Sequence, residues 1–259
     1  MVALKPGTSV ATGVRGAHNR PMEMSRSLIA RNLGAHSRFE TEELMAIEAA
    51  LGRVVRSVEA RRDILREGDA PQTIKFVLEG WVSRYKELPD GRRQILSLMI
   101  PGDICDANAF ILEEMDHSLG AITTVRYAEI GREEFDAIVA SSLNMAKALW
   151  RSELVTASIQ REWTMSVGQR TAPERISHLF CEMYARLAGL GLTQGGSCEF
   201  PLTQADIGEA TGLTSVHVNR TLQALRREGL VELRARRLHV LDHDRLREKA
   251  MFAPSYLHL

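Results

Sequence analysis

The side chains best suited to chemistry in this sequence form a short polar cluster around residue 217. Ser215, His217, Asn219 and Arg220 lie close together and are separated only by valines. Arginine presents two parallel N–H donors that match the O6 and N7 acceptors of guanine, and histidine or asparagine donates to bases or phosphates. The cluster therefore predicts contacts to the edges of DNA bases.

A second group of cations follows directly. Between residues 215 and 237, Arg220, Arg226, Arg227, Arg234, Arg236 and Arg237 are opposed only by Glu228 and Glu232. The whole chain of 259 residues is neutral, with 33 Lys and Arg against 33 Asp and Glu, so this excess of positive charge is local. A local basic surface is typical of proteins that contact the phosphates of nucleic acid.

Two short helices and a hairpin are predicted to position these side chains. Thr203 and Thr214 are residues of the kind that begin helices, and Gly212 supplies the permissive backbone of a tight turn between them. The spacing of Ile207, Ala210, Leu213, Val218, Leu222 and Leu225 is that of a small core between two crossed helices. These features predict a helix-turn-helix, and the strand-like runs 230–233 and 238–241 add a wing with a basic tip.

The predicted DNA-binding residues follow from this arrangement. They are Thr203, Thr214, Ser215, Val216, His217, Asn219, Arg220, Arg234, Arg236 and Arg237. The outer, N-terminal side of the second helix would read base edges, and the arginines of the wing would contact phosphates. The alternative is a structural helical domain whose arginines only face solvent.

A long helix is predicted upstream of the helix-turn-helix. Residues 133–168 contain no proline, and the only glycine is the last residue. An apolar stripe runs through Met145, Leu149, Val155, Ile159, Trp163 and Val167. A single helix of this length would span about 50 Å, so we expect the stripe to pair with a second copy of the chain. The alternative is that the stripe packs along the chain's own β-rich domain.

The segment before this helix is predicted to be rich in β-strands. Glycines recur between short apolar runs at Gly68, Gly80, Gly91 and Gly102, and Asp90–Gly91 is a hairpin turn signal. Regular turns favour a compact barrel or sandwich between residues 50 and 131, preceded by a short helix through Ile47 and Leu51.

The first 35 residues are basic and show no sustained periodicity. Lys5, Arg15, Arg20, Arg26 and Arg31 are opposed only by Glu23. We expect a flexible tail here, with an arm that contacts DNA as the alternative.

Composition excludes several other classes of protein. The 44% of hydrophobic and 25% of charged residues are ordinary globular values, and no apolar run is long enough to predict a membrane span. Cys105, Cys181 and Cys198 are too few and too widely spaced for a disulfide framework or a metal knuckle, so we expect a reducing cytoplasm. His117 is the only histidine between residues 40 and 130, whereas a cupin-like metal enzyme would need a cluster of His and Glu ligands. Other catalytic motifs are absent from the sequence. We therefore expect no enzymatic activity, no metal and no cofactor.

Four stretches of the sequence occur in the order found in one family of regulators. They are Arg66-Glu67-Gly68-Asp69, Val77-Leu78-Glu79-Gly80, Pro101-Gly102-Asp103 and residues 202–230. Through them, the chain from about residue 38 to residue 246 resembles the Crp–Fnr superfamily of bacterial transcription regulators.

The resemblance implies an α+β fold with a β-roll (jelly-roll-like) sensor domain, a long dimerisation helix and a C-terminal winged helix-turn-helix. Its divisions would be a tail at 1–35, the sensor at 36–132, the dimerisation helix at 133–170 and the DNA-binding domain at 171–259. The resemblance also implies a cytoplasmic homodimer that binds palindromic double-stranded DNA and recruits or blocks RNA polymerase.

The sensor pocket departs from the family's cyclic-nucleotide pattern. Asp106 and Ala107 stand where the family has Gly-Glu, His117 and Ser118 where it has Arg followed by Ser or Thr, and Gln160 and Arg161 where it has Thr-Ser. Residues 94–125 contain several carboxylates but no Lys or Arg, so a buried phosphate would lack a cation. We therefore expect a pocket without the usual phosphate and ribose ligands. No cysteine precedes Cys105, which excludes the family's N-terminal iron–sulfur cluster.

Two alternatives stay open. One is a cyclic-nucleotide-responsive regulator with an unconventional pocket, in which Arg161 supplies charge from the helix side. The other is an adaptor built on the same fold that does not bind DNA, although the arginine-rich wing argues against it.

Overall fold

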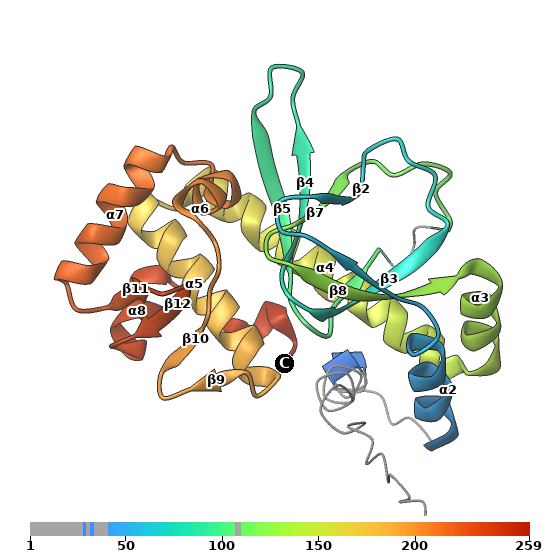
Figure 1. The fold of residues 1–259 in the computed structure, drawn as a ribbon. Coiled ribbons are helices and arrows are strands. Elements are labelled where there is room, and N and C mark those ends of the chain that lie inside the picture. Colours follow the sequence, from blue (N-terminus) through green and yellow to red (C-terminus); the bar gives the residue numbers. More distant parts are fainter. Residues whose placement is uncertain (1–27, 30–31, 34–40, 107–109) are drawn as a thin grey trace, which may run out of the picture.

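A computed structural model describes residues 28–29, 32–33, 41–106 and 110–259. The N-terminal half is a β-domain of two four-stranded antiparallel sheets, in the orders β1-β8-β3-β6 and β2-β7-β4-β5 (Figure 1). Its elements are α2 (Thr41–Leu51), β1 (Val55–Val58), β2 (Asp63–Leu65), β3 (Thr73–Glu79), β4 (Val82–Glu87), β5 (Arg93–Met99), β6 (Ile104–Cys105), β7 (Ser118–Ala121) and β8 (Val125–Gly131). The predicted β-rich segment and the short helix before it are confirmed.

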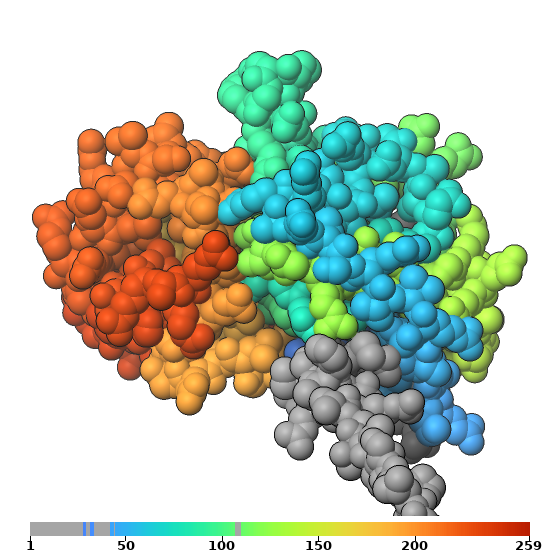
Figure 2. All heavy atoms as spheres, viewed as in Figure 1, coloured from blue at the N-terminus to red at the C-terminus, as the bar shows by residue number. Residues whose placement is uncertain are grey.

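The two sheets enclose a small apolar core. Val77, Val82, Leu119 and Val125 are fully buried between them, because inward-facing positions on these strands carry branched aliphatic residues. The turn between β3 and β4 requires glycine: Gly80 has φ +85°, and a Cβ there would lie 2.3 Å from the carbonyl oxygen of Thr124. The β4–β5 hairpin projects well beyond this core (Figure 2).

The predicted single helix over residues 133–168 is in fact two helices. α3 (Arg132–Ser141) and α4 (Leu143–Gln169) are separated by Ser142, whose backbone is extended at φ −150° and ψ 122°. The Ser142 hydroxyl accepts a hydrogen bond from the Met145 N–H and donates to a carboxylate oxygen of Glu43. A serine that caps a new helix interrupts the old one, and the pattern of apolar residues did not reveal this.

The apolar stripe predicted to pair with a second chain mostly packs inside this one. Met145 and Leu149 lie in a core with α2 and the β-domain, while Ile159 and Trp163 lie in a core with α5. Within the stripe, only Val167 is exposed. For these residues the prediction of self-association is wrong. The alternative, packing along the β-rich domain, describes Met145 and Leu149, whereas Ile159 and Trp163 lie in the core that also contains α5.

The C-terminal half, here called the winged domain, lies at the opposite end of the molecule, with α7 on its outer side (Figure 1). Its elements are α5 (Ala172–Gly189), β9 (Thr193–Gln194), β10 (Ser197–Glu199), α6 (Gln204–Thr211), α7 (Ser215–Arg227), β11 (Val231–Arg234), β12 (Arg237–Val240), α8 (His243–Ala250) and the 3-10 helix η1 (Pro254–Leu257). Thr171 is the N-cap of α5, and its N–H donates to Glu174 Oε2 at 2.7 Å.

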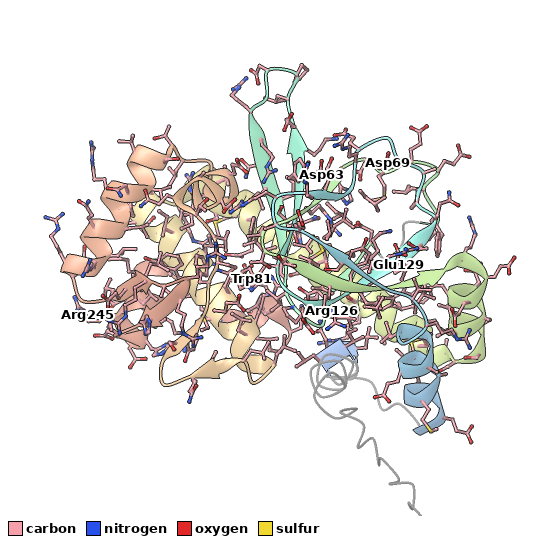
Figure 3. The ribbon with its side chains drawn as sticks, in the orientation of Figure 1. Asp63, Asp69, Trp81, Arg126, Glu129 and Arg245 are labelled. Carbon is pink, nitrogen blue, oxygen red and sulfur yellow. The ribbon has the colours of Figure 1, made fainter. Side chains whose placement is uncertain are left out.

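One apolar core joins the two halves. Trp81 of the β-domain is fully buried, and its ring contacts that of Phe200 at 5.9 Å between centroids, while Phe200 contacts Phe180 of α5 at 5.1 Å. Figure 3 shows Trp81 at this junction. Aromatic side chains of the β-domain and of the winged domain therefore pack on one another in one buried core.

Part of the predicted tail belongs to the folded domain. Leu28, Ile29 and Leu33 are buried, and the Asn32 side-chain amide donates to the Gly102 carbonyl oxygen and to Asp103 Oδ1, both at 3.0 Å. For these residues the prediction of a flexible tail is wrong, because the apolar side chains that stand among the basic residues pack into the cores of the folded chain. The alternative of a DNA-contacting arm falls on residues outside those described.

Candidate nucleic-acid interface

The first helix of the predicted helix-turn-helix, α6, is held at both ends by its own sequence. At its start, the Thr203 N–H donates to Asp206 Oδ2 at 2.7 Å, and the Asp206 N–H donates back to Thr203 Oγ1 at 3.2 Å. At its end, Gly212 takes the left-handed conformation at φ +66°. Gly208 permits the close turn, because a Cβ there would lie 2.5 Å from the Leu213 carbonyl oxygen.

The second helix, α7, packs on α6 with the predicted core. Ile207, Val218 and Leu225 are almost fully buried, and Ala210, Leu213 and Leu222 complete the contact. Thr214 caps α7 by accepting from the His217 N–H at 3.3 Å. This confirms the predicted helix-turn-helix and leaves the opposite side of α7 facing solvent.

The structure brings most of the predicted base-reading residues together on that side. Ser215, Val216, His217 and Arg220 are exposed, and Val216 has an exposed fraction of 71%. Asn219 is half-buried, and its amide nitrogen donates to Gln204 Oε1 at 3.2 Å while its oxygen accepts from Gln223 Nε2 at 3.0 Å. Sequence reasoning missed these glutamines, although Gln204 directly follows the predicted cap.

The wing is a hairpin with a two-residue turn. Ala235 and Arg236 both have positive φ, 48° and 58°, which matches the twist of the flanking strands β11 and β12. Arg234 and Arg236 are exposed at the tip. Arg237 is half-buried and donates to Ser197 Oγ at 2.9 Å, so part of its hydrogen-bonding capacity is used inside the domain.

Among the predicted DNA-binding residues, Thr203 and Thr214 differ from the others because their side chains cap helices. The side-chain hydroxyls of Thr203 and Thr214 both serve as helix caps, and Thr203 Oγ1 also donates to Asp206 Oδ2 at 2.7 Å. Their side chains are still exposed, so each could also approach a phosphate at the start of its helix.

Arg175 connects the helix-turn-helix to the end of α4. Its Nη1 donates to the Thr211 carbonyl oxygen at 2.6 Å, and its Nη2 donates to the carbonyl oxygens of Val167 and Arg170, both at 2.9 Å. The last turns of α4 and α6 leave such carbonyls without partners in the helix. One guanidinium therefore ties both helix ends to the start of α5.

Two of the predicted sensor residues, Asp106 and His117, belong to a second cluster, between the β-domain and α4. Arg84 Nη2 donates to Asp106 Oδ1, while His117 Nε2 lies 3.0 Å from Asp106 Oδ2 and His117 Nδ1 lies 2.5 Å from Asp116 Oδ1. A cavity beside them is lined by Arg84, Lys86, Gln94, Asp116, His117, Gln160 and Trp163, among others. The expectation that this region lacks a cation is wrong, because Arg84 and Lys86 reach it from β4, before residue 94.

Burial and charge act in opposite directions in this cluster. Burial alone would raise the pKa of Asp106, but His117 and Arg84 lower it below its ordinary value. Burial would lower the pKa of His117, and Asp106 and Asp116 instead raise it. The cationic groups are thus already neutralised by carboxylates of the same chain.

The other predicted pocket residues play smaller parts. Ser118 is buried and its hydroxyl accepts from the Glu67 N–H at 3.0 Å. Gln160 lines the cavity, whereas Arg161 is exposed and is not among its lining residues. Ala107 lies outside the described part of the chain. Within that part, no group of His, Cys, Asp or Glu side chains is arranged to hold a metal ion, and no helix has the length and hydropathy to cross a bilayer.

The fold and the exposed face of α7 define a class: a transcription regulator with a β-roll domain joined to a winged helix-turn-helix. Comparisons with known proteins agree with this assignment. A model of the Crp-like helix-turn-helix domain matches residues 174–249, and a model of the cyclic nucleotide-binding domain matches residues 55–142. The chain belongs to the Crp–Fnr superfamily.

Several relatives match along most of their length. The chain is 27% identical to the transcriptional activator protein FnrL of Cereibacter sphaeroides over 85% of this chain and 89% of that protein. It is 28% identical to the nitrogen fixation regulation protein FixK of Azorhizobium caulinodans over 89% and 92%. The solved structure of FixK2 from Bradyrhizobium japonicum is similar with a TM-score of 0.70 and 25% identity, covering 77% of this chain and 98% of that one.

Proposed function

We propose that this protein is a homodimeric regulator whose two α7 helices read the half-sites of a palindromic DNA sequence. The observation that carries the proposal is the exposed cluster of Ser215, Val216, His217 and Arg220, placed at the N-terminal end of α7 by a buried helix–helix core. Arg220 would pair with guanine, Val216 would contact a thymine methyl group, and Arg234 and Arg236 would bind phosphates.

The dimer contact would use the face of α4 opposite to the stripe predicted from the sequence. Leu143, Trp150 and Leu154 expose 68%, 67% and 67% of their surface, and they follow one another seven and four residues apart along α4. Large apolar side chains in a line on a helix favour a partner helix with the same pattern. A second copy of this chain supplies that pattern by symmetry.

The regulator would act on RNA polymerase, and its relatives favour activation. FnrL is described as a transcriptional activator, and this chain is similar to it over most of its length. A protein of this kind works inside the cell, where DNA and polymerase are present, and it would not be an enzyme.

The sensor would not respond to a cyclic nucleotide in the usual way. The Asp106 carboxylate already binds Arg84 and His117, so the phosphate of a nucleotide would have to displace it. Arg161 would not assist within the same chain, because it lies outside the lining of the cavity.

The decisive experiment is to select binding sites for the purified protein from random duplex DNA at fixed salt, with and without cyclic AMP. We expect the same palindrome to be enriched in both arms, with half-sites about one helical turn, or 34 Å, apart. Enrichment only with the nucleotide would overturn the proposal for the pocket. If the protein selects no sequence and has no salt-dependent affinity for duplex DNA, it is instead the adaptor.

A further inference from the structure

Helix α6 lies between α7, the helix proposed to read DNA, and the β-domain. Ile207 and Ala210 face α7 in the core of the helix-turn-helix, while the carboxylates of Asp206 and Glu209 meet two arginines of the β-domain. Since α7 packs on α6, whatever holds α6 also sets the orientation of the base-reading face.

The first contact joins Arg61, in the loop between β1 and β2, to Asp206. Arg61 Nη1 and Nη2 donate to the two carboxylate oxygens of Asp206 at 2.6 and 2.8 Å, a paired geometry that fixes direction as well as distance. The Asp206 side chain is only 3% exposed, whereas that of Arg61 is 47% exposed. The same carboxylate caps α6, so Arg61 binds the helix at its first turn.

The backbone of Arg61 is unusual for this residue type. Its φ is +67°, in the left-handed region that favours glycine or asparagine, and its N–H donates to the Ala121 carbonyl oxygen at 2.7 Å. An arginine in this conformation is strained at the backbone, which points to a use for its side chain. The structure shows that side chain on Asp206.

The second contact joins Arg93, at the start of β5, to Glu209. Arg93 Nε donates to Glu209 Oε2 at 2.8 Å, and its guanidinium lies over the Tyr85 ring at 4.2 Å. The Tyr85 hydroxyl in turn donates to Asp63 Oδ1 at 2.7 Å. Figure 3 shows Asp63 near the base of the β4–β5 hairpin, two residues after Arg61. The two contacts to α6 thus come from one connected part of the β-domain.

We propose that Arg61 is a positioning residue for DNA recognition: it binds Asp206 and holds α6, and with it α7, at a set orientation on the β-domain. The inference rests on the proposed function, because orientation matters most when two recognition helices must match two half-sites at once. Arg61 touches no base or phosphate in this role and acts through Asp206.

The test compares Arg61→Gln with Arg62→Gln, a matched control that removes the same charge from the next residue, whose side chain is also exposed. Affinity is measured on the selected palindrome and on a single half-site. We expect Arg61→Gln to lose about tenfold on the palindrome, a typical coupling between sites, while its half-site affinity equals that of the control. Arg61→Lys, which keeps the charge but not the paired geometry, should recover only part of the loss.

A double-mutant cycle with Asp206→Asn separates positioning from general loss of stability. If Arg61 acts through Asp206, the double variant should bind the palindrome no more weakly than the weaker single variant. If Asp206→Asn fails to fold because α6 loses its cap, Glu209→Gln, which leaves the cap intact, should also weaken palindrome binding more than half-site binding.

Three results would overturn the inference: equal palindrome affinities for Arg61→Gln and Arg62→Gln, an equal loss on palindrome and half-site, or tighter binding by Arg61→Gln. These failures are distinct from failure of the proposed function, in which the unaltered protein would select no palindrome at all.

Discussion

Arg220 and Arg236 are both exposed arginines of the winged domain, but they stand on different elements. Arg220 lies on the outer face of α7 among the residues predicted to read bases, whereas Arg236 occupies the tip of the wing. At the scale of single residues, their positions predict different contributions to binding, since base contacts specify a sequence and phosphate contacts do not.

Replacing Arg220 with alanine should reduce affinity for the selected site by about 1–3 kcal/mol and relax the preference at one base position. Arg236→Ala should weaken binding to selected and random duplexes alike, and should reduce the slope of log affinity against log salt by about one. Titrations of both variants on both duplexes, at several salt concentrations, measure these effects. Equal losses on the two duplexes for Arg220→Ala would make Arg220 a phosphate contact instead.

At the scale of elements, α4 has two apolar faces, one buried within the chain and one exposed. Trp163 lies on the inner face, where its Nε1 donates to both oxygens of the buried Glu182 carboxylate at 3.1 and 3.0 Å. Leu154 lies on the outer face with 67% of its surface exposed. The apolar pattern in the sequence identified the inner face as the dimer contact, and the structure instead buries that face within the chain.

Leu154→Glu should therefore shift the protein from dimer to monomer, because it places a pair of like charges in the proposed contact. Leu241→Glu is the matched control, since Leu241 is 58% exposed and lies on the winged domain, away from α4. Light scattering or sedimentation over a range of concentrations gives the dimer dissociation constant. An unchanged constant for Leu154→Glu would remove the outer face of α4 from the dimer contact.

Trp163→Glu would act differently from a dimer variant. It would bring a second carboxylate next to Glu182, which is fully buried and whose pKa is raised chiefly by burial. The expected outcome is loss of folded protein.

At the scale of the whole molecule, α4 and the winged domain meet in a polar cluster inside the shared core. The Tyr256 hydroxyl of η1 donates to Glu182 Oε2 at 2.7 Å, and the His178 ring is stacked on Tyr256 at 5.8 Å between centroids. Arg170 Nη2 donates to Glu162 Oε1 at 2.7 Å, so that carboxylate is already paired with a cation beside His178. The stability of this junction should depend on pH through His178.

Burial, assisted by the nearby Arg170 charge, lowers the pKa of His178 from 6.5 to about 3. Between these pH values the unfolded chain binds a proton at His178 and the folded chain does not, so stability falls as pH drops below about 6.5. The contribution is about 1.4 kcal/mol per pH unit in that window. In His178→Gln the decline of Tm between pH 6.5 and 4.5 should be shallower than in the unaltered protein. His243→Gln, at an exposed histidine, should leave the slope unchanged, and an unchanged slope in His178→Gln would contradict the prediction.

Local signals in the sequence were enough to predict the helix-turn-helix and the wing. Helix caps such as Thr203 and Thr214, the left-handed Gly212 and the spacing of Ile207 and Val218 act over a few residues, so their meaning does not depend on distant parts of the chain. The same holds for the glycine-marked turns of the β-domain. The amino-acid sequence by itself therefore determined the helix-turn-helix and the face of α7 that is predicted to meet DNA, and its resemblance to known regulators indicated the superfamily.

Only the tertiary structure decided which partners meet across long distances in the sequence. Arg84 enters the sensor cluster from β4, and Arg61 reaches Asp206 from 145 residues away. The packing of α2, the β-domain and α5 buries the inner face of α4 and leaves Leu154 exposed. Apolar periodicity shows that a helix has a face to bury but not what covers it, and a charge in the sequence does not show which carboxylate neutralises it. Both are settled by how the elements pack, because burial and ion pairing depend on distance in space rather than along the chain.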